Sequence, residues 1–128
     1  IDIEKIKYTI EYPIKSSTRV LFNRLSTAGG LSEWFADDVH VNGSKFTFIW
    51  DGAEQEAELV TKKDQKYVKF KWLDEGDENT YFEFRINRDD LTGDTALIIT
   101  DFAEEDDIDD SRDLWDTQIS ALKQILGI

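Results

Sequence analysis

The sequence predicts an α+β fold in which a curved antiparallel sheet of six to seven strands wraps around a long C-terminal helix. Apolar and charged residues alternate through most of residues 38–102, which is typical of strands that bury one face. Over residues 109–126 the apolar period becomes that of a helix about five turns long, enough to cover that face. No linker, repeat or proline-rich segment divides the 128 residues, so we expect one domain over residues 1–128.

The N-terminal part predicts one strand and two short helices. Apolar and polar side chains alternate over residues 5–12 until a proline interrupts the pattern. Ser16 or Ser17 can then cap a helix, because a serine hydroxyl accepts a hydrogen bond from a free amide of the first turn. We expect the glycine pair at residues 29–30 to end this helix, and a second helical piece to cover residues 31–35.

The central part predicts a meander of short strands. An Asp-Gly pair at residues 51–52 is typical of a hairpin turn, and a polar turn is expected at residues 74–79. Glutamates and lysines at outward positions should pair across neighbouring strands, each pair adding about 0.2–1 kcal/mol. The predicted strands are residues 38–42, 45–50, 53–59, 68–72, 81–86 and 95–102.

The last predicted element is the helix over residues 109–126, which Gly127 can cap. Apolar side chains recur on one stripe of this helix, so that stripe should face the sheet. The stripe consists of Leu114, Trp115, Gln118, Ile119, Leu122, Ile125 and Leu126.

The formal net charge of −13 argues against nucleic acid and anionic membranes as partners, because both require clustered lysines and arginines. No apolar stretch is long enough to span a bilayer, and the N-terminus lacks the apolar run of a signal peptide. The chain contains no cysteine, which excludes disulfides and thiolate chemistry. We therefore expect a cytoplasmic protein without a cofactor.

Acidic residues gather before and within the start of the last helix, where residues 101–116 contain nine acids and one base. Their spacing does not fit a calcium-binding EF-hand loop, because the sixth position counted from Asp107 is Arg112 instead of glycine. Carboxylates near a helix N-terminus each gain about 0.3–1 kcal/mol from the helix dipole, and weak surface cation binding remains the alternative. The residues in that position are Asp109, Asp110 and Asp113.

Catalytic and metal-binding motifs are scarce. His40 is the one histidine, and its alternation with two valines predicts an ordinary surface side chain. No G-x-S-x-G motif accompanies it, so a Ser-His-Asp triad is not indicated. Aspartates at strand ends, such as Asp37 and Asp51, are interpreted as solvated turn residues.

Three segments carry a resemblance to a known family. Residues 31–37 read LSEWFAD, residues 95–100 read TALIIT, and Trp115, Ile119 and Leu122 lie at helical spacing. They resemble the L-x-x-W-F segment, the T-x-L-x-I strand and the W-x-x-x-L-x-x-L helix of the START-like superfamily, also called SRPBCC. The likeness is to its branch homologous to activators of the heat-shock protein 90 ATPase. It implies a helix-grip fold, in which sheet and terminal helix can enclose a cavity.

The sequence departs from that family at Asp101, where a histidine often follows the T-x-L-x-I strand. This departure warns against transferring polar cavity chemistry. Bulky side chains at inward positions are instead expected to line the cavity, with Tyr81 and Gln118 orienting a ligand. The candidate ligand-binding residues are Trp34, Phe48, Trp50, Phe70, Trp72, Tyr81, Phe82, Phe84, Trp115, Gln118, Ile119 and Leu122.

Three functions follow in order of preference. The first is a non-catalytic module that holds a small hydrophobic or lipid-like ligand between the sheet and the last helix. The second is a protein-interaction module of the chaperone-ATPase-activator type, whose acidic surface would meet a basic partner. The third is a cyclase- or hydrolase-like enzyme. The identity of the ligand, whether aromatic side chains fill the cavity, and the oligomeric state are left open at this point.

Overall fold

The computed structural model describes residues 4–73 and 80–128, so the turn predicted at residues 74–79 lies outside the described residues. Within the described parts, seven strands form one antiparallel sheet in the order β1-β7-β6-β5-β4-β3-β2. The strands are β1 (Lys5–Pro13), β2 (Asp38–Asn42), β3 (Lys45–Trp50), β4 (Ala53–Lys63), β5 (Tyr67–Trp72), β6 (Phe82–Arg88) and β7 (Thr95–Glu104). The predicted sheet is thus confirmed.

Alternation along each strand decides which side chains are buried. Phe84 of β6 lies opposite Ile99 of β7, and Ile99 lies opposite Ile10 of β1, so apolar side chains form a continuous inner face. On the outer face the Nζ atom of Lys45 lies 3.0 Å from the Oε2 atom of Glu56, an ion pair between β3 and β4. This is the kind of exposed cross-strand pair that the sequence predicts.

The β3–β4 hairpin and a bulge in β4 shape the sheet. Asp51 and Gly52 both have positive φ angles, 49° and 81°, as expected for the tight hairpin turn that an Asp-Gly pair favours. The register between β4 and β5 shifts between Leu59 and Thr61, where β4 has one residue more than its partner. A bulge of this kind increases the local twist and bends the strand.

The two short helices differ from their predicted bounds. Helix α1 (Thr18–Ser26) is capped by Ser17, whose Oγ atom accepts a hydrogen bond from the Val20 amide, but it ends before the glycine pair. The predicted helix over residues 31–35 is wrong: helix α2 (Ala28–Leu31) contains the glycines, and turns follow it. Thr27 explains the shift, because its Oγ1 atom accepts from the Gly30 amide and starts a new helix there.

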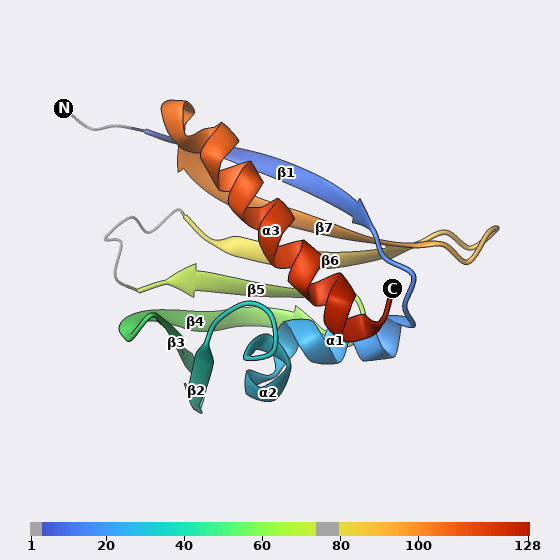
Figure 1. Cartoon of the computed structure of the whole chain (residues 1–128), viewed down its shortest axis with the longest axis horizontal. Coiled ribbons are helices and arrows are strands. Elements are labelled where there is room, and N and C mark those ends of the chain that lie inside the picture. Colours follow the sequence, from blue (N-terminus) through green and yellow to red (C-terminus); the bar gives the residue numbers. More distant parts are fainter. Residues whose placement is uncertain (1–3, 74–79) are drawn as a thin grey trace.

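Helix α3 (Ile108–Leu126) crosses the inner face of the sheet obliquely, while α1 and α2 close one end (Figure 1). A single 3-10 turn (Glu105–Asp107) precedes α3. Trp115, Ile119 and Leu122 form its buried face, and Gly127 ends it in the left-handed conformation, with a φ of 75°, as predicted. No helix of the described residues is long and apolar enough to cross a membrane. The α+β helix-grip architecture predicted from the sequence is confirmed.

Candidate ligand-binding pocket

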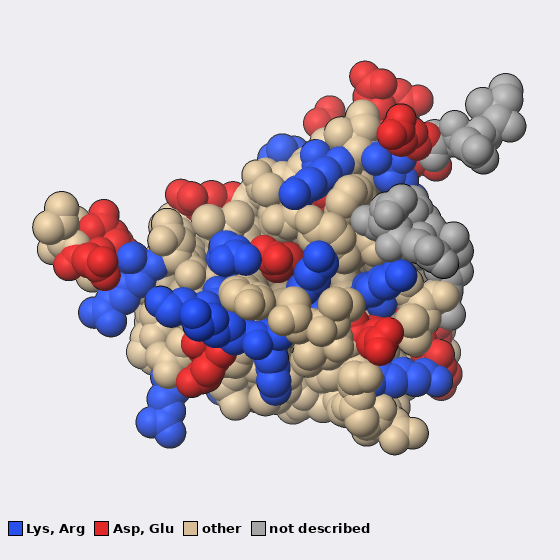
Figure 2. Space-filling model, turned by 180° about the vertical axis from the view of Figure 1, so that it is seen from behind, with Lys and Arg blue, Asp and Glu red and all other residues tan. Residues whose placement is uncertain are grey.

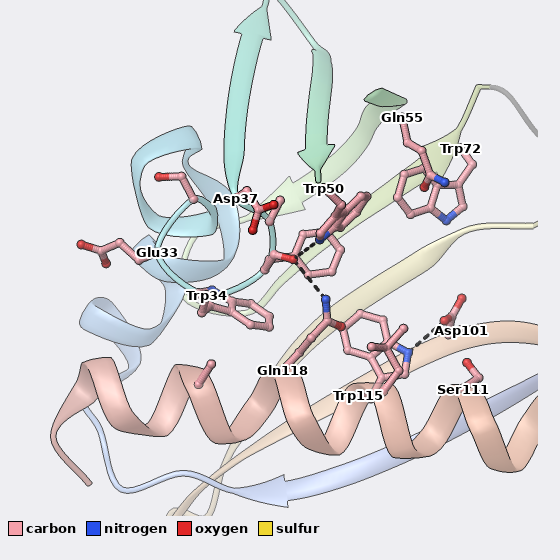
Figure 3. A pocket seen from close by; sticks show the side chains of 15 residues that line it. Glu33, Trp34, Asp37, Trp50, Gln55, Trp72, Asp101, Ser111, Trp115 and Gln118 are labelled. Carbon is pink, nitrogen blue, oxygen red and sulfur yellow. Dashed lines mark hydrogen bonds between the residues drawn. The ribbon is translucent and has the colours of Figure 1, made fainter. Parts of the chain in front are cut away.

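A pocket of about 770 Å³ opens where the loop after α2 meets the ends of β3 and β5 and the middle of α3 (Figure 3). The sequence contains four tryptophans, and each of them lines this pocket: Trp34, Trp50, Trp72 and Trp115. They come from the loop, β3, β5 and α3, so the fold gathers them from distant parts of the chain. The wall is therefore largely aromatic, which suits an apolar ligand.

Phe35 forms the inner limit of the pocket and is only 4% exposed. Its ring stacks on Trp115 of α3, with centroids 5.8 Å apart, and on Phe82 of β6, with centroids 5.6 Å apart. One side chain thus fills the space between the sheet and α3 at this level. The pocket lies outside the Phe35 ring, where the space between the sheet and α3 opens to solvent.

The backbone of the same residue joins the layers. The Phe35 carbonyl oxygen accepts hydrogen bonds from Trp50 Nε1, at 2.8 Å, and from Gln118 Nε2, at 3.1 Å (Figure 3). The loop, β3 and α3 are therefore tied together by one acceptor. Gln118, predicted to orient a ligand, uses its Nε2 group to hold the wall of the pocket.

A second polar cluster lies at the other end of the pocket. Asp101 Oδ2 accepts hydrogen bonds from Trp115 Nε1, at 2.9 Å, and from the Tyr8 hydroxyl, at 3.3 Å. Tyr8 is also hydrogen-bonded to the Ser111 hydroxyl. Burial raises the pKa of Tyr8 above its ordinary value of 10.0, and the nearby Asp101 charge adds to the rise. Asp101, the departure from the family pattern, thus orients an indole of the pocket wall.

The charged residues at the pocket are acidic. Glu33, Asp37 and Asp101 line it, and the described lining residues include no lysine, arginine or histidine. Glu33 is paired with Arg24, whose Nε atom lies 2.8 Å from Glu33 Oε2. Asp37 is exposed, and its Oδ2 atom accepts a hydrogen bond of 2.8 Å from the Asp51 amide. Asp37 therefore places an exposed carboxylate at the opening.

The structure divides the predicted site residues into three groups. The four tryptophans and Gln118 line the pocket. Tyr81 does not: it lies on the outer face of the sheet, where its ring contacts Phe102 at a centroid distance of 5.0 Å and lies under Lys69 Nζ. Its alternation with inward Phe82 explains this placement. The remaining residues are buried in the core beneath the pocket: Phe48, Phe70, Phe82, Phe84, Ile119 and Leu122.

Several lining residues were missed from the sequence, and some carried a usable signal. Phe35 directly follows Trp34 in the LSEWFAD segment, and Gln55 shares the inner face with its cross-strand partner Phe48. A polar residue at an inward strand position indicates either the edge of the buried core or a binding site. Asp37 carried no such signal, because it is exposed and only the fold brings it to the pocket. Leu114 and Ile125 belong to the stripe predicted to face the sheet, and that prediction is wrong for both: they are exposed, and Leu114 lines the rim of the pocket.

The structure also places the other residues considered from the sequence: possible metal ligands, the histidine and the aspartates at the start of α3. No three histidines or carboxylates of the described residues gather as metal ligands would. His40 is exposed on β2, as predicted, with its Nε2 atom 3.3 Å from Asp38 Oδ2. Asp109 and Asp110 lie in the first turn of α3, where the sequence places them.

Comparisons with solved structures agree with this architecture. A protein from Bacteroides fragilis, solved by solution NMR, is 38% identical over 94% of this chain and 90% of its own, with a TM-score of 0.69. The Aha1 dimer from Colwellia psychrerythraea is 20% identical over 96% of this chain and 97% of its own, with a TM-score of 0.81. A protein from Mesorhizobium loti is 16% identical over 95% and 97%, with a TM-score of 0.77. A comparison with curated proteins gives no match to this chain.

The family model described as a START-like superfamily domain matches residues 2–128. The resemblance drawn from residues 31–37, residues 95–100 and the stripe of α3 is thereby confirmed, and the Aha1 protein shares the fold. This chain belongs to the START-like superfamily.

Proposed function

We propose that the protein is a non-catalytic binding module. It would hold a small amphipathic molecule in the pocket where the space between the sheet and α3 opens to solvent. The observation that carries the proposal is the convergence of every tryptophan of the chain on one opening. A volume of about 770 Å³ lies within the range of roughly 300–1,000 Å³ that is usual for small-molecule sites. Because Phe35 fills the interior, the ligand would lie at the opening and remain partly exposed.

Affinity would come from apolar area covered by the indole rings, at roughly 25 cal/mol per Å² removed from water. Trp50 and Trp72 are half-buried, so both have surface left to cover. The N–H groups of Trp34, Trp50 and Trp115 already donate to protein acceptors. Within the described part of the chain, Trp72 Nε1 has no such acceptor, so it is available to orient a polar atom of the ligand.

Tryptophan fluorescence tests the proposal directly, since each emitting side chain lines the pocket. We expect apolar alcohols and amphiphiles to shift or quench the emission in a saturable way. Replacing the indole with Trp72→Ala should weaken binding about tenfold, while Tyr67→Ala, on the outer face of the same strand, should leave it unchanged. A broad ligand panel that leaves the emission unchanged, with native mass spectra of the bare chain alone, would contradict the proposal.

The interaction module and the enzyme remain predictions. The likeness to the Aha1 dimer concerns the fold, and the pocket carries the proposal of ligand binding more directly.

A further inference from the structure

We infer that the pocket selects ligands that carry a positive charge, such as an amine or quaternary ammonium group attached to an apolar body. This inference rests on the proposed binding function and adds the charge of the ligand to it. Two independent features of the pocket support it: the arrangement of its aromatic rings and the sign of its charged groups.

The rings form a corner that suits an organic cation. Trp50 and Trp72 lie side by side at the opening, with centroids 6.3 Å apart and planes inclined at 53°, and both are half-buried (Figure 3). Cations are attracted to the face of an aromatic ring, and tryptophan attracts them most strongly. The apolar part of the same ligand can lie against Leu114 and Ala121 of α3, which line the opposite wall.

The charges at the pocket favour the same class of ligand. Asp37 and Asp101 line it, and at neutral pH an aspartate ordinarily carries one negative charge. The hydrogen-bond donor to the Asp37 carboxylate is the neutral Asp51 amide, and Asp37 is exposed at the opening. A fatty acid or other anion would bring a like charge next to this carboxylate and be repelled.

Several basic side chains lie on the opposite side of the sheet. Lys69 and Lys71 alternate with inward residues of β5, and lysines and arginines gather over the face turned away from α3 (Figure 2). Exposed charges further apart than a Debye length, about 8 Å at physiological salt, are largely screened. Nearer the pocket, Arg24 is paired with Glu33, and Arg112 lies over the Tyr8 ring, 5.3 Å from its centroid. The lysines of the outer face therefore do not offset the charge of Asp37, and the net charge of −13 adds to its attraction for cations.

Three probes with the same alkyl chain isolate the effect of charge: decyltrimethylammonium and decanoate, each used below its micelle concentration, and 1-decanol, used below its solubility limit. Titrations followed by tryptophan fluorescence and calorimetry should give the tightest binding for the ammonium, on the order of tenfold tighter than for 1-decanol. Decanoate should bind most weakly. Added salt should weaken binding of the ammonium and leave 1-decanol nearly unaffected.

Matched variants assign the preference to the pocket. Asp37→Asn keeps an oxygen for the Asp51 amide but removes the charge, so it should lower ammonium affinity several-fold without changing 1-decanol binding. Asp113→Asn removes one charge from an exposed position of α3 outside the pocket and should change neither affinity. Leu114→Lys places a cation at the rim, where Leu114 is 60% exposed, and should reverse the order of the ammonium and decanoate.

The outcomes separate this inference from the function on which it rests. Equal affinity for the three probes, or tighter binding of decanoate, would overturn the charge preference and leave ligand binding intact. Absence of binding by all three probes would overturn both. Equal losses in Asp37→Asn and Asp113→Asn would show that the net charge of the molecule, not the pocket, attracts the cation, which also overturns the inference.

Discussion

Phe35 shows how one side chain determines where the pocket lies. Its ring packs against both layers of the fold, and its carbonyl oxygen accepts two hydrogen bonds that hold the pocket wall. Core side chains in proteins pack at crystal-like density, so a ring in this place leaves little room beside it. The sequence left open whether aromatic side chains fill the space between sheet and helix; the Phe35 ring fills it at this level, and the pocket lies outside that ring.

Phe35→Ala should be strongly destabilising. Removing a buried phenyl ring costs about 3–5 kcal/mol through lost apolar transfer and the cavity left behind. Urea denaturation followed by circular dichroism measures the change in unfolding free energy. Phe102→Ala, at a half-buried ring on the outer face, should cost less than about 2 kcal/mol. A smaller loss for Phe35→Ala than for Phe102→Ala would contradict the role assigned to this ring.

Tyr12 gives a prediction about pH. Its hydroxyl donates a hydrogen bond of 2.6 Å to Asp116 Oδ1, and burial together with this carboxylate raises its pKa well above the ordinary 10.0. The folded state favours the protonated phenol, so this stabilisation is fully present below pH ~10 and is lost as the pH rises further. Alkaline denaturation series should show stability falling above that pH.

Tyr12→Phe isolates this contribution. The variant should lose about 1 kcal/mol at neutral pH, the usual value of one hydrogen bond, and should show a shallower fall in stability at alkaline pH. Tyr67→Phe, on the outer face of β5, is the control and should behave like the original protein. An unchanged alkaline slope in Tyr12→Phe would rule out Tyr12 as its source.

At the scale of elements, the close contact between α1 and α2 positions the loop that carries Trp34 and Phe35. A Cβ atom added to Gly30 would lie 2.3 Å from the Asn23 carbonyl oxygen and 2.6 Å from the Arg24 Cα atom, both of them backbone atoms of α1. Only glycine permits this approach. Gly30, which the sequence presents as part of a helix stop, is therefore required for the close packing of α2 on α1.

Gly30→Ala and Gly29→Ala form a matched pair in one short helix. Gly30→Ala should cost about 2 kcal/mol or more, because the backbone of α1 or α2 must move, and it should weaken ligand binding by displacing the loop. Gly29 faces open space, so Gly29→Ala should change stability by less than about 1 kcal/mol. Thermal melts of the two variants compare them, and similar losses would refute the packing role.

For the whole molecule, the uneven distribution of charge is the main feature. Acids gather around the start of α3 and line the pocket, while lysines and arginines occupy the outer face of the sheet (Figure 2). The net charge of −13 remains after all 15 bases are counted against the 28 acids, so ion pairs such as Lys45 with Glu56 do not reduce it. Self-repulsion should therefore oppose compaction at low ionic strength.

Added sodium chloride should raise the melting temperature. Screening weakens repulsion among exposed acids more than it weakens the buried contacts of the core. Melting curves at increasing salt concentration test this, with an uncharged osmolyte at matched osmolality as the control. A melting temperature that falls with salt would mean that ion pairs, and not repulsion, dominate the electrostatics of the fold.

Alternation and helical spacing predicted most of the fold, because each depends on local geometry and on burial of one face. The strands, the long helix and its glycine cap follow from that pattern. The bounds of α2 could not be predicted from that pattern, since they depend on the hydroxyl of Thr27 and on the space that α1 leaves beside Gly30. A short helix without an amphipathic stripe offers no periodic signal of its own.

For the site, the pattern predicted the direction of the four tryptophans but not the empty volume between them. Asp37 and Asp101 come from segments far apart in the sequence, and only the sheet register and the path of α3 bring them to one opening. The sequence alone determined the net charge and most of the buried faces, because these are properties of composition and period, and the motifs at residues 31–37 and 95–100 carried the resemblance to the superfamily. The tertiary structure decided where the pocket opens and which charges line it, because volume depends on how side chains from distant elements fill the space between them.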